Sequence, residues 1–149
     1  MGPDNEFKKY NKKLEKLGEE LSKIQYDFKI KDNSSEKYWI KRTQEFGNYH
    51  KKTVEYFTEA CSLIRLSNKE QSNMFLLRVS KLIQLGSKVL NDMEKIKKNP
   101  STMNSKDKQQ SRWSKDLRDQ LIKSNKECLD HEKRMNVFFK DYYEKNLMK

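Results

Sequence analysis

The stretch MFLLRVSKLIQLGSKVLNDMEKI, residues 74–96, sets the pattern for the whole chain. Its seam positions recur in alternating steps of four and three residues, at Phe75, Val79, Leu82, Gly86, Val89, Met93 and Ile96. This is heptad spacing, with which a helix keeps one line of side chains against a partner helix. A second apolar line runs beside the first at intervals of seven, through Leu76, Ile83 and Leu90. The combined face is too broad for a two-stranded coil, so we expect this helix to contact at least two neighbours.

Three other segments have the same helical spacing. The first covers about residues 6–30, with apolar positions at Phe7, Tyr10, Leu14, Leu17, Leu21, Ile24 and Phe28. The second follows the polar break at residues 31–35 and carries Trp39, Phe46, Tyr49, Tyr56, Phe57, Ala60, Leu63 and Ile64. The last begins between Ser105 and Ser111, extends to about residue 145 and carries Trp113, Leu117, Leu121, Cys128, Met135, Phe138 and Tyr142. Each segment is therefore predicted to be an amphipathic helix.

The connections indicate how these helices are arranged. Ser67 and Glu70 have the spacing of a capping box, which predicts a short turn between the second and third helices. Pro100 ends the third helix, and the polar residues 99–110 are expected to form a flexible loop. We predict a single all-α domain over residues 1–149, an elongated antiparallel up-down-up-down four-helix bundle with coiled-coil-like packing. The alternative has three long helices, with the second and third fused, and residues 1–5 are expected to be a tag or disordered.

The sequence offers little that could carry catalysis. Neither histidine, His50 or His131, follows a Glu by three residues, so the di-iron motif of helical bundles is absent. Cys128 and His131 are spaced for two zinc ligands, which Cys61 and His50 could complete, but buried thiols and a marginal histidine are the ordinary interpretation. The chain has no Gly-rich phosphate loop. We therefore predict no enzyme, and no catalytic, cofactor, metal or small-molecule site.

Charge is the other marked property of the chain. The net charge is +11, and only six of the 33 basic residues are arginine, the residue suited to bidentate phosphate binding. An equal alternative is that the lysine excess reflects a biased genome. In the predicted topology the first and third connections meet at one end, where eleven basic residues face four acidic ones and leave +7. We call this set the basic tip and expect it to contact any anionic partner: Lys29, Lys31, Lys37, Lys41, Arg42, Lys95, Lys97, Lys98, Lys106, Lys108 and Arg112.

These features predict a non-enzymatic helical interaction module, either a scaffold or adaptor or a subunit of a coiled-coil assembly. Its partners would be other proteins or further copies of the chain. The alternative is binding to anionic membrane surfaces, because the chain is similar in character, though not in motif, to curved helical modules of the BAR type. Nucleic acid ranks lower, since the aromatic residues fall on the helix seams. Two cysteines, no signal-peptide core and no long apolar run predict a cytoplasmic protein, peripheral to the membrane under the alternative hypothesis.

Overall fold

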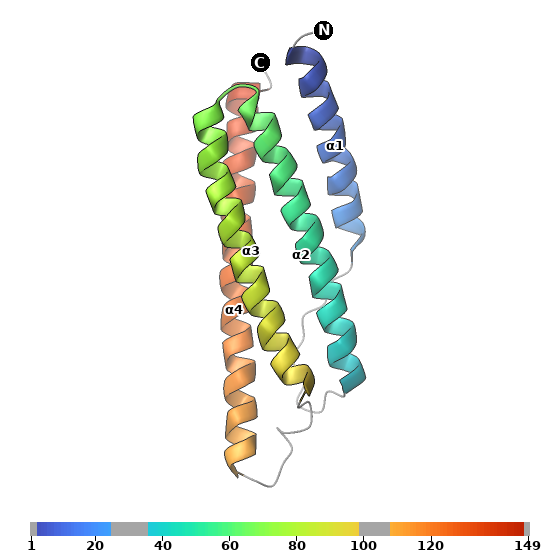
Figure 1. The fold of residues 1–149 in the computed structure, drawn as a ribbon, viewed down its shortest axis with the longest axis vertical. Coiled ribbons are helices and arrows are strands. Elements are labelled where there is room, and N and C mark those ends of the chain that lie inside the picture. Colours follow the sequence, from blue (N-terminus) through green and yellow to red (C-terminus); the bar gives the residue numbers. More distant parts are fainter. Residues whose placement is uncertain (1–2, 25–35, 99–107, 148–149) are drawn as a thin grey trace.

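The protein consists of long helices laid side by side, as its computed structural model shows (Figure 1). The structure describes residues 3–24, 36–98 and 108–147, with side chains for all of these except 3–4 and 108–114. The elements are α1 (Pro3–Lys23), α2 (Glu36–Arg65), α3 (Lys69–Lys98), α4 (Lys108–Tyr142) and a π-helical turn, η2 (Tyr143–Leu147), which extends α4. No residue within these described ranges lies in a strand.

Successive helices run in opposite directions, so that α1 begins and α4 ends at the same end of the bundle (Figure 1). The helix α3 packs against both α2 and α4, and α1 packs against α2. The predicted antiparallel four-helix bundle is therefore confirmed, and so is the prediction that the third helix has at least two neighbours. The three-helix alternative is wrong, because α2 ends at Arg65 and α3 begins at Lys69.

The turn between α2 and α3 is capped by a different residue from the one predicted. The side-chain Oδ1 of Asn68 accepts a hydrogen bond from the backbone N–H of Gln71 at 3.0 Å, so Asn68 is the N-cap of α3. The hydroxyl of Ser67 instead donates to the carbonyl of Ile64 at 3.1 Å. Ser67 thus serves the carboxyl end of α2, and the predicted capping box of Ser67 and Glu70 is wrong.

The first helix differs from its prediction at both ends. It begins at Pro3, since proline is well tolerated in the first turn of a helix, and its last helical residue is Lys23 rather than a residue near 30. In consequence α1 reaches only about midway along α2 (Figure 1). Leu21, predicted as core, lies in its last turn and is only half-buried. The predicted seam residue Phe28 lies outside the described residues.

The last helix matches its prediction closely. It begins at Lys108, within the expected interval, and at 35 residues it is longer than the other described helices. The predicted loop at 99–110 is shorter than expected, because residues 108–110 already belong to α4. Residues 99–107 lie outside the described part of the chain, so the flexibility predicted for them stays a prediction.

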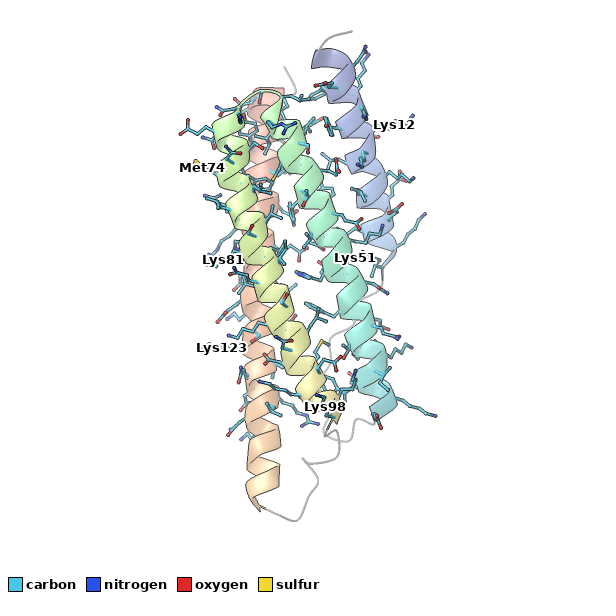
Figure 2. All side chains as sticks on the ribbon, viewed as in Figure 1. Lys12, Lys51, Met74, Lys81, Lys98 and Lys123 are labelled. Carbon is cyan, nitrogen blue, oxygen red and sulfur yellow. The ribbon has the colours of Figure 1, made fainter. Side chains whose placement is uncertain are left out.

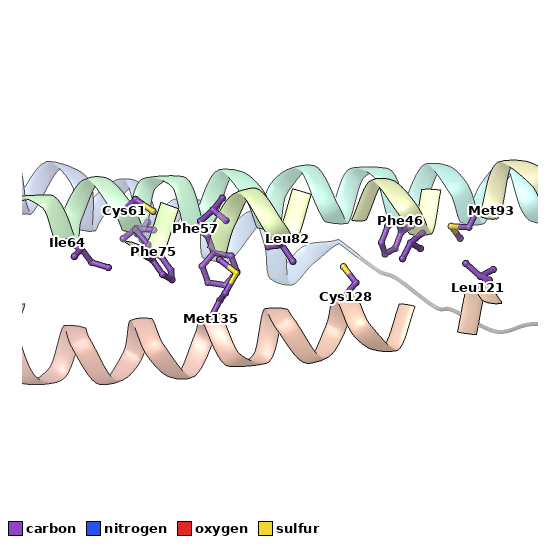
Figure 3. Packing of buried hydrophobic residues seen from close by; sticks show 14 of the residues in the cluster. Phe46, Phe57, Cys61, Ile64, Phe75, Leu82, Met93, Leu121, Cys128 and Met135 are labelled. Carbon is purple, nitrogen blue, oxygen red and sulfur yellow. The ribbon is translucent and has the colours of Figure 1, made fainter. Parts of the chain in front are cut away.

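The core lies mainly between α2, α3 and α4, as Figure 3 shows for its central part. Toward the end that holds the turn between α2 and α3 it is aromatic: Phe57 meets Phe75 edge to face at 6.0 Å, and Phe75 stacks on Phe138 at 5.2 Å. Toward the opposite end it contains Phe46, Met93 and Leu121 (Figure 3). Seam spacing in the sequence therefore predicted the core well, and Leu82 at its centre is fully buried.

Candidate functional site

The structure places the described members of the basic tip at one end of the bundle. Lys37, Lys41 and Arg42 lie in the first turns of α2, while Lys95, Lys97 and Lys98 lie in the last turns of α3, whose end Figure 2 marks with Lys98. Two further members lie in the first turns of α4, where only their position in the helix is described: Lys108 and Arg112. The remaining three lie outside the described residues: Lys29, Lys31 and Lys106.

Two of these basic side chains already form ion pairs within the bundle. Arg42 forms an ion pair with Glu45, and its guanidinium lies 5.0 Å from the centre of the Tyr38 ring. The ammonium of Lys97 lies 2.8 Å from a carboxylate oxygen of Glu94. Both groups are therefore poor candidates for binding a partner.

Four lysines of the tip remain exposed: Lys37, Lys41, Lys95 and Lys98. None of them forms an ion pair with an acidic residue in the described ranges. Unpaired ammonium groups on long flexible stems can reach an anionic surface. Fewer basic side chains of the tip are therefore available to an anionic partner than the sequence predicted.

A second surface is apolar and lies along α2 and α3. Leu76 and Ile83, predicted to widen the buried face of α3, are 45% and 42% exposed. Leu90, the third member of that line, is half-buried and packs on the core. The two helices that contact α3 therefore cover its first apolar line but leave most of the second uncovered.

The facing side of α2 carries an equivalent line. Leu90 meets Gly47, where an added Cβ would lie 3.9 Å from the Leu90 Cδ2 atom. Ile40 and Val54 lie seven residues to either side of Gly47 and so share its helix face. Ile40 is 39% exposed, and Val54 is half-buried against the core.

Because α2 and α3 are antiparallel, the two lines run beside each other. The contact between Gly47 and Leu90 fixes the register, and one heptad further along it Val54 comes level with Ile83. We call this surface the α2–α3 stripe: Ile40, Gly47, Val54, Leu76, Ile83 and Leu90. The half on α2 was not predicted, although the spacing of seven between Ile40, Gly47 and Val54 is visible in the sequence.

The buried histidine of α2 has a packing role. The His50 ring stacks on Phe46, with 5.9 Å between ring centres, and lies directly over Gly86. A Cβ at position 86 would come within 1.9 Å of the His50 Cε1 atom. Burial lowers the pKa of His50 and so favours its neutral form. The missing side chain at Gly86 therefore leaves room for the imidazole of His50 from the neighbouring helix.

Neither cysteine has the environment of a nucleophile. Burial raises the pKa of the Cys61 thiol to about 12 and that of the Cys128 thiol to about 11, so both stay protonated near neutral pH. Figure 3 shows the two well apart along the core, and His131 bonds instead to the carbonyl of Arg78 at 2.8 Å. Among the described residues no group of three or more His, Cys, Asp or Glu side chains is placed to hold a metal ion.

Two buried carboxyl groups cross-link α4 to its neighbours. The Tyr49 hydroxyl on α2 donates to the Glu132 Oε1 atom on α4 at 2.6 Å, and burial raises the pKa of Glu132. The Ser124 hydroxyl on α4 donates to the Asp92 Oδ2 atom on α3 at 2.9 Å. Ser124, which interrupts the apolar stripe of the last helix, is therefore a hydrogen-bond donor inside the bundle.

A pocket of about 490 Å³ lies between α1, α2 and α4. Aromatic side chains form much of its wall, and Tyr143 at the start of η2 donates a hydrogen bond to the Asn11 Oδ1 atom at 3.1 Å. Glu15 and Lys140 bring opposite charges to its lining. The pocket lies where α1 approaches α4, against which it packs less closely than against α2.

The chain matches no family model, no curated protein and no solved structure. No helix in the described ranges combines the length and the apolar character that crossing a membrane requires. Two surfaces of the described chain are therefore candidates for contact with a partner: the α2–α3 stripe and the exposed lysines of the basic tip.

Proposed function

We propose that the protein is a non-enzymatic interaction module that binds a partner protein through the α2–α3 stripe. The observation that carries this proposal is the exposure of Ile40, Leu76 and Ile83 on two packed helices at seam spacing. Isolated exposed apolar residues are ordinary, but these three belong to two neighbouring apolar rows, an arrangement typical of a surface that another element covers. Docking of a helix against such rows is a common mode of protein recognition.

The test replaces two exposed residues of the stripe by lysine, Leu76→Lys together with Ile83→Lys. Because both side chains are already largely in water, the helicity and melting temperature should change little. Proteins captured from a lysate of the source cells by the parent chain should be lost from the variant. Sedimentation of the parent and the variant separates a partner protein from self-association.

The matched control is Ile122→Lys together with Val137→Lys on α4. These residues are 51% and 69% exposed, so the control makes the same chemical change at similarly exposed apolar positions away from the stripe. Capture that falls only in the stripe variant supports the proposal. Equal loss from both variants, or no loss from either, contradicts it.

A second candidate function is contact with an anionic membrane surface through the basic tip. The observation in its favour is that four lysines at one end are exposed and unpaired with described residues: Lys37, Lys41, Lys95 and Lys98. Each lysine near an acidic leaflet contributes about 1 kcal/mol, so four would suffice for recruitment that depends on salt.

The test of this candidate is co-sedimentation with vesicles of phosphatidylserine and phosphatidylcholine. Lys95→Glu together with Lys98→Glu should weaken binding, and the control Lys8→Glu with Lys12→Glu, on the exposed face of α1, should weaken it less. Equal weakening by both pairs would mean that only the net charge matters. No binding by the parent chain at low salt would remove the candidate.

A further inference from the structure

The length of the α2–α3 stripe fits one helix. On α2 it extends from Ile40 to beyond Val54, and on α3 it extends to Leu76, which the register brings level with residue 61. Twenty-one residues of helix rise about 31 Å, so an occupant that covers the stripe needs about six turns. A longer contact would extend past the apolar residues onto the polar ends of both helices.

At one position the stripe has no side chain, and we call this position the hole. Gly47 lies between Ile40 and Val54 on the same face of α2 and contributes no side chain of its own. An added Cβ there would meet only Leu90, at an ordinary contact distance of 3.9 Å. An apolar residue of a docked helix can therefore approach the α2 backbone at this position and pack beside Leu90.

Two basic residues of α2, two heptads apart, lie beside the stripe. Lys51 and Arg65 on α2 are exposed, and neither forms an ion pair within the described part of the chain. Two acidic residues beside the stripe are already engaged: Glu55, four residues after Lys51, pairs with Lys52, and Glu94, four residues after Leu90, pairs with Lys97. A partner that places carboxylates beside Lys51 and Arg65 would therefore meet complementary charge.

The same charges disfavour a second copy of this chain as the occupant. A two-fold symmetric contact through the stripe would oppose the stripe of one copy to the identical stripe of the other. Lys51 and Arg65 of both copies would then lie in the same interface, in molecules that each carry +11. Like charges across an interface oppose association, which favours a different protein as the occupant.

We infer that the α2–α3 stripe binds a single amphipathic helix of about 20 residues from an acidic partner protein. This inference rests on the proposed function and adds to it the secondary structure, length and charge of the partner. Apolar residues of that helix at heptad spacing lie between the two rows, one of them in the hole at Gly47. Its acidic residues lie beside Lys51 and Arg65.

The experiment uses two synthetic 21-residue helical peptides with leucine at heptad positions and either glutamate or lysine at all flanking positions. Binding of the labelled peptides to the full chain is measured by fluorescence anisotropy across a salt series. The glutamate peptide should bind and weaken as salt rises, and the lysine peptide should bind at least about tenfold more weakly. Equal affinity for both peptides would overturn the inference.

Two variants locate the contact. Gly47→Leu fills the hole and should reduce affinity for the glutamate peptide by about tenfold or more, without lowering the melting temperature, because leucine favours helix. Lys51→Glu with Arg65→Glu should also reduce it, whereas the matched charge change Lys123→Glu with Lys126→Glu on α4 should have less effect. Unchanged affinity in Gly47→Leu would overturn the inference.

Failure of the inference can be separated from failure of the proposed function. If neither peptide binds, but Leu76→Lys with Ile83→Lys still abolishes partner capture, the stripe binds something other than an acidic helix. If neither peptide binds and Leu76→Lys with Ile83→Lys also leaves partner capture unchanged, both the inference and the proposed function are wrong.

Discussion

Replacing Gly86 by alanine sets two known effects against each other. In a helix interior alanine is favoured over glycine by about 0.8–1.0 kcal/mol, so α3 alone would gain stability. The new Cβ, however, would lie 1.9 Å from the His50 Cε1 atom, about half an ordinary carbon–carbon contact distance. His50 is buried and stacked on Phe46, so it cannot move aside without losing that contact.

We expect the clash to outweigh the gain in helix propensity. Overpacking in a core costs about 1–3 kcal/mol, and the depth of this overlap puts the cost at the upper end of that range. The net loss in the free energy of unfolding should be about 2 kcal/mol, or about 4–8 °C in melting temperature for a chain of this size. Gly86→Leu, with a larger side chain, should be more damaging still.

The double variant His50→Ala with Gly86→Ala tests whether the His50 ring causes the loss of stability. With His50→Ala in place the obstacle is gone, so Gly86→Ala should then stabilise the fold by about 1 kcal/mol through propensity alone. Urea unfolding followed by far-UV circular dichroism gives all four free energies of the cycle. Stabilisation of the parent chain by Gly86→Ala, or an effect of the same sign with and without His50, would refute the expected clash.

Three further predictions concern the core, the cap and the buried carboxyl group. Leu82→Ala should lower the free energy of unfolding by about 2–5 kcal/mol in urea titrations, because Leu82 is fully buried, and a loss under about 1 kcal/mol would contradict that burial. Asn68→Ala should cost about 1 kcal/mol by the same measurement and more than Ser67→Ala, since Asn68 is the N-cap, and the reverse order would contradict the assignment. Burial raises the folded-state pKa of Glu132 above the ordinary 4.5, so between the two pKa values the folded state binds more protons than the unfolded state. The stability of the parent chain should therefore fall as pH rises from about 4.5 through the folded-state pKa. Glu132→Gln keeps an acceptor for Tyr49 and should be more stable than the parent at pH 7. In unfolding curves measured across pH, this advantage should disappear below about pH 4.5. No advantage at pH 7 would contradict the destabilising effect of burying this carboxylate.

The sequence by itself determined the helical class, the order of the elements and most of the core. Heptad spacing is a property of neighbouring residues along one helix, so Phe75, Val79 and Leu82 identify a seam before any partner is known. The short turn after Arg65 and the proline at 100 set the helix limits well enough to predict an antiparallel bundle. The basic tip followed from that topology, and the i,i+3 spacing of Glu45 with Arg42 and of Glu94 with Lys97 is a sequence signal for the two ion pairs that were missed there.

Only the tertiary structure decided which apolar line is covered. Leu76 and Ile83 have the same seam spacing as the buried line, but burial depends on whether a neighbouring helix lies over a face, which spacing alone does not record. The same applies to Leu21, left half-buried in the last turn of the short α1, and to Gly86, whose missing side chain is explained by His50 from another helix. Periodicity is local, whereas coverage depends on the lengths and positions of all the helices together, and the α2–α3 stripe is what that coverage leaves open.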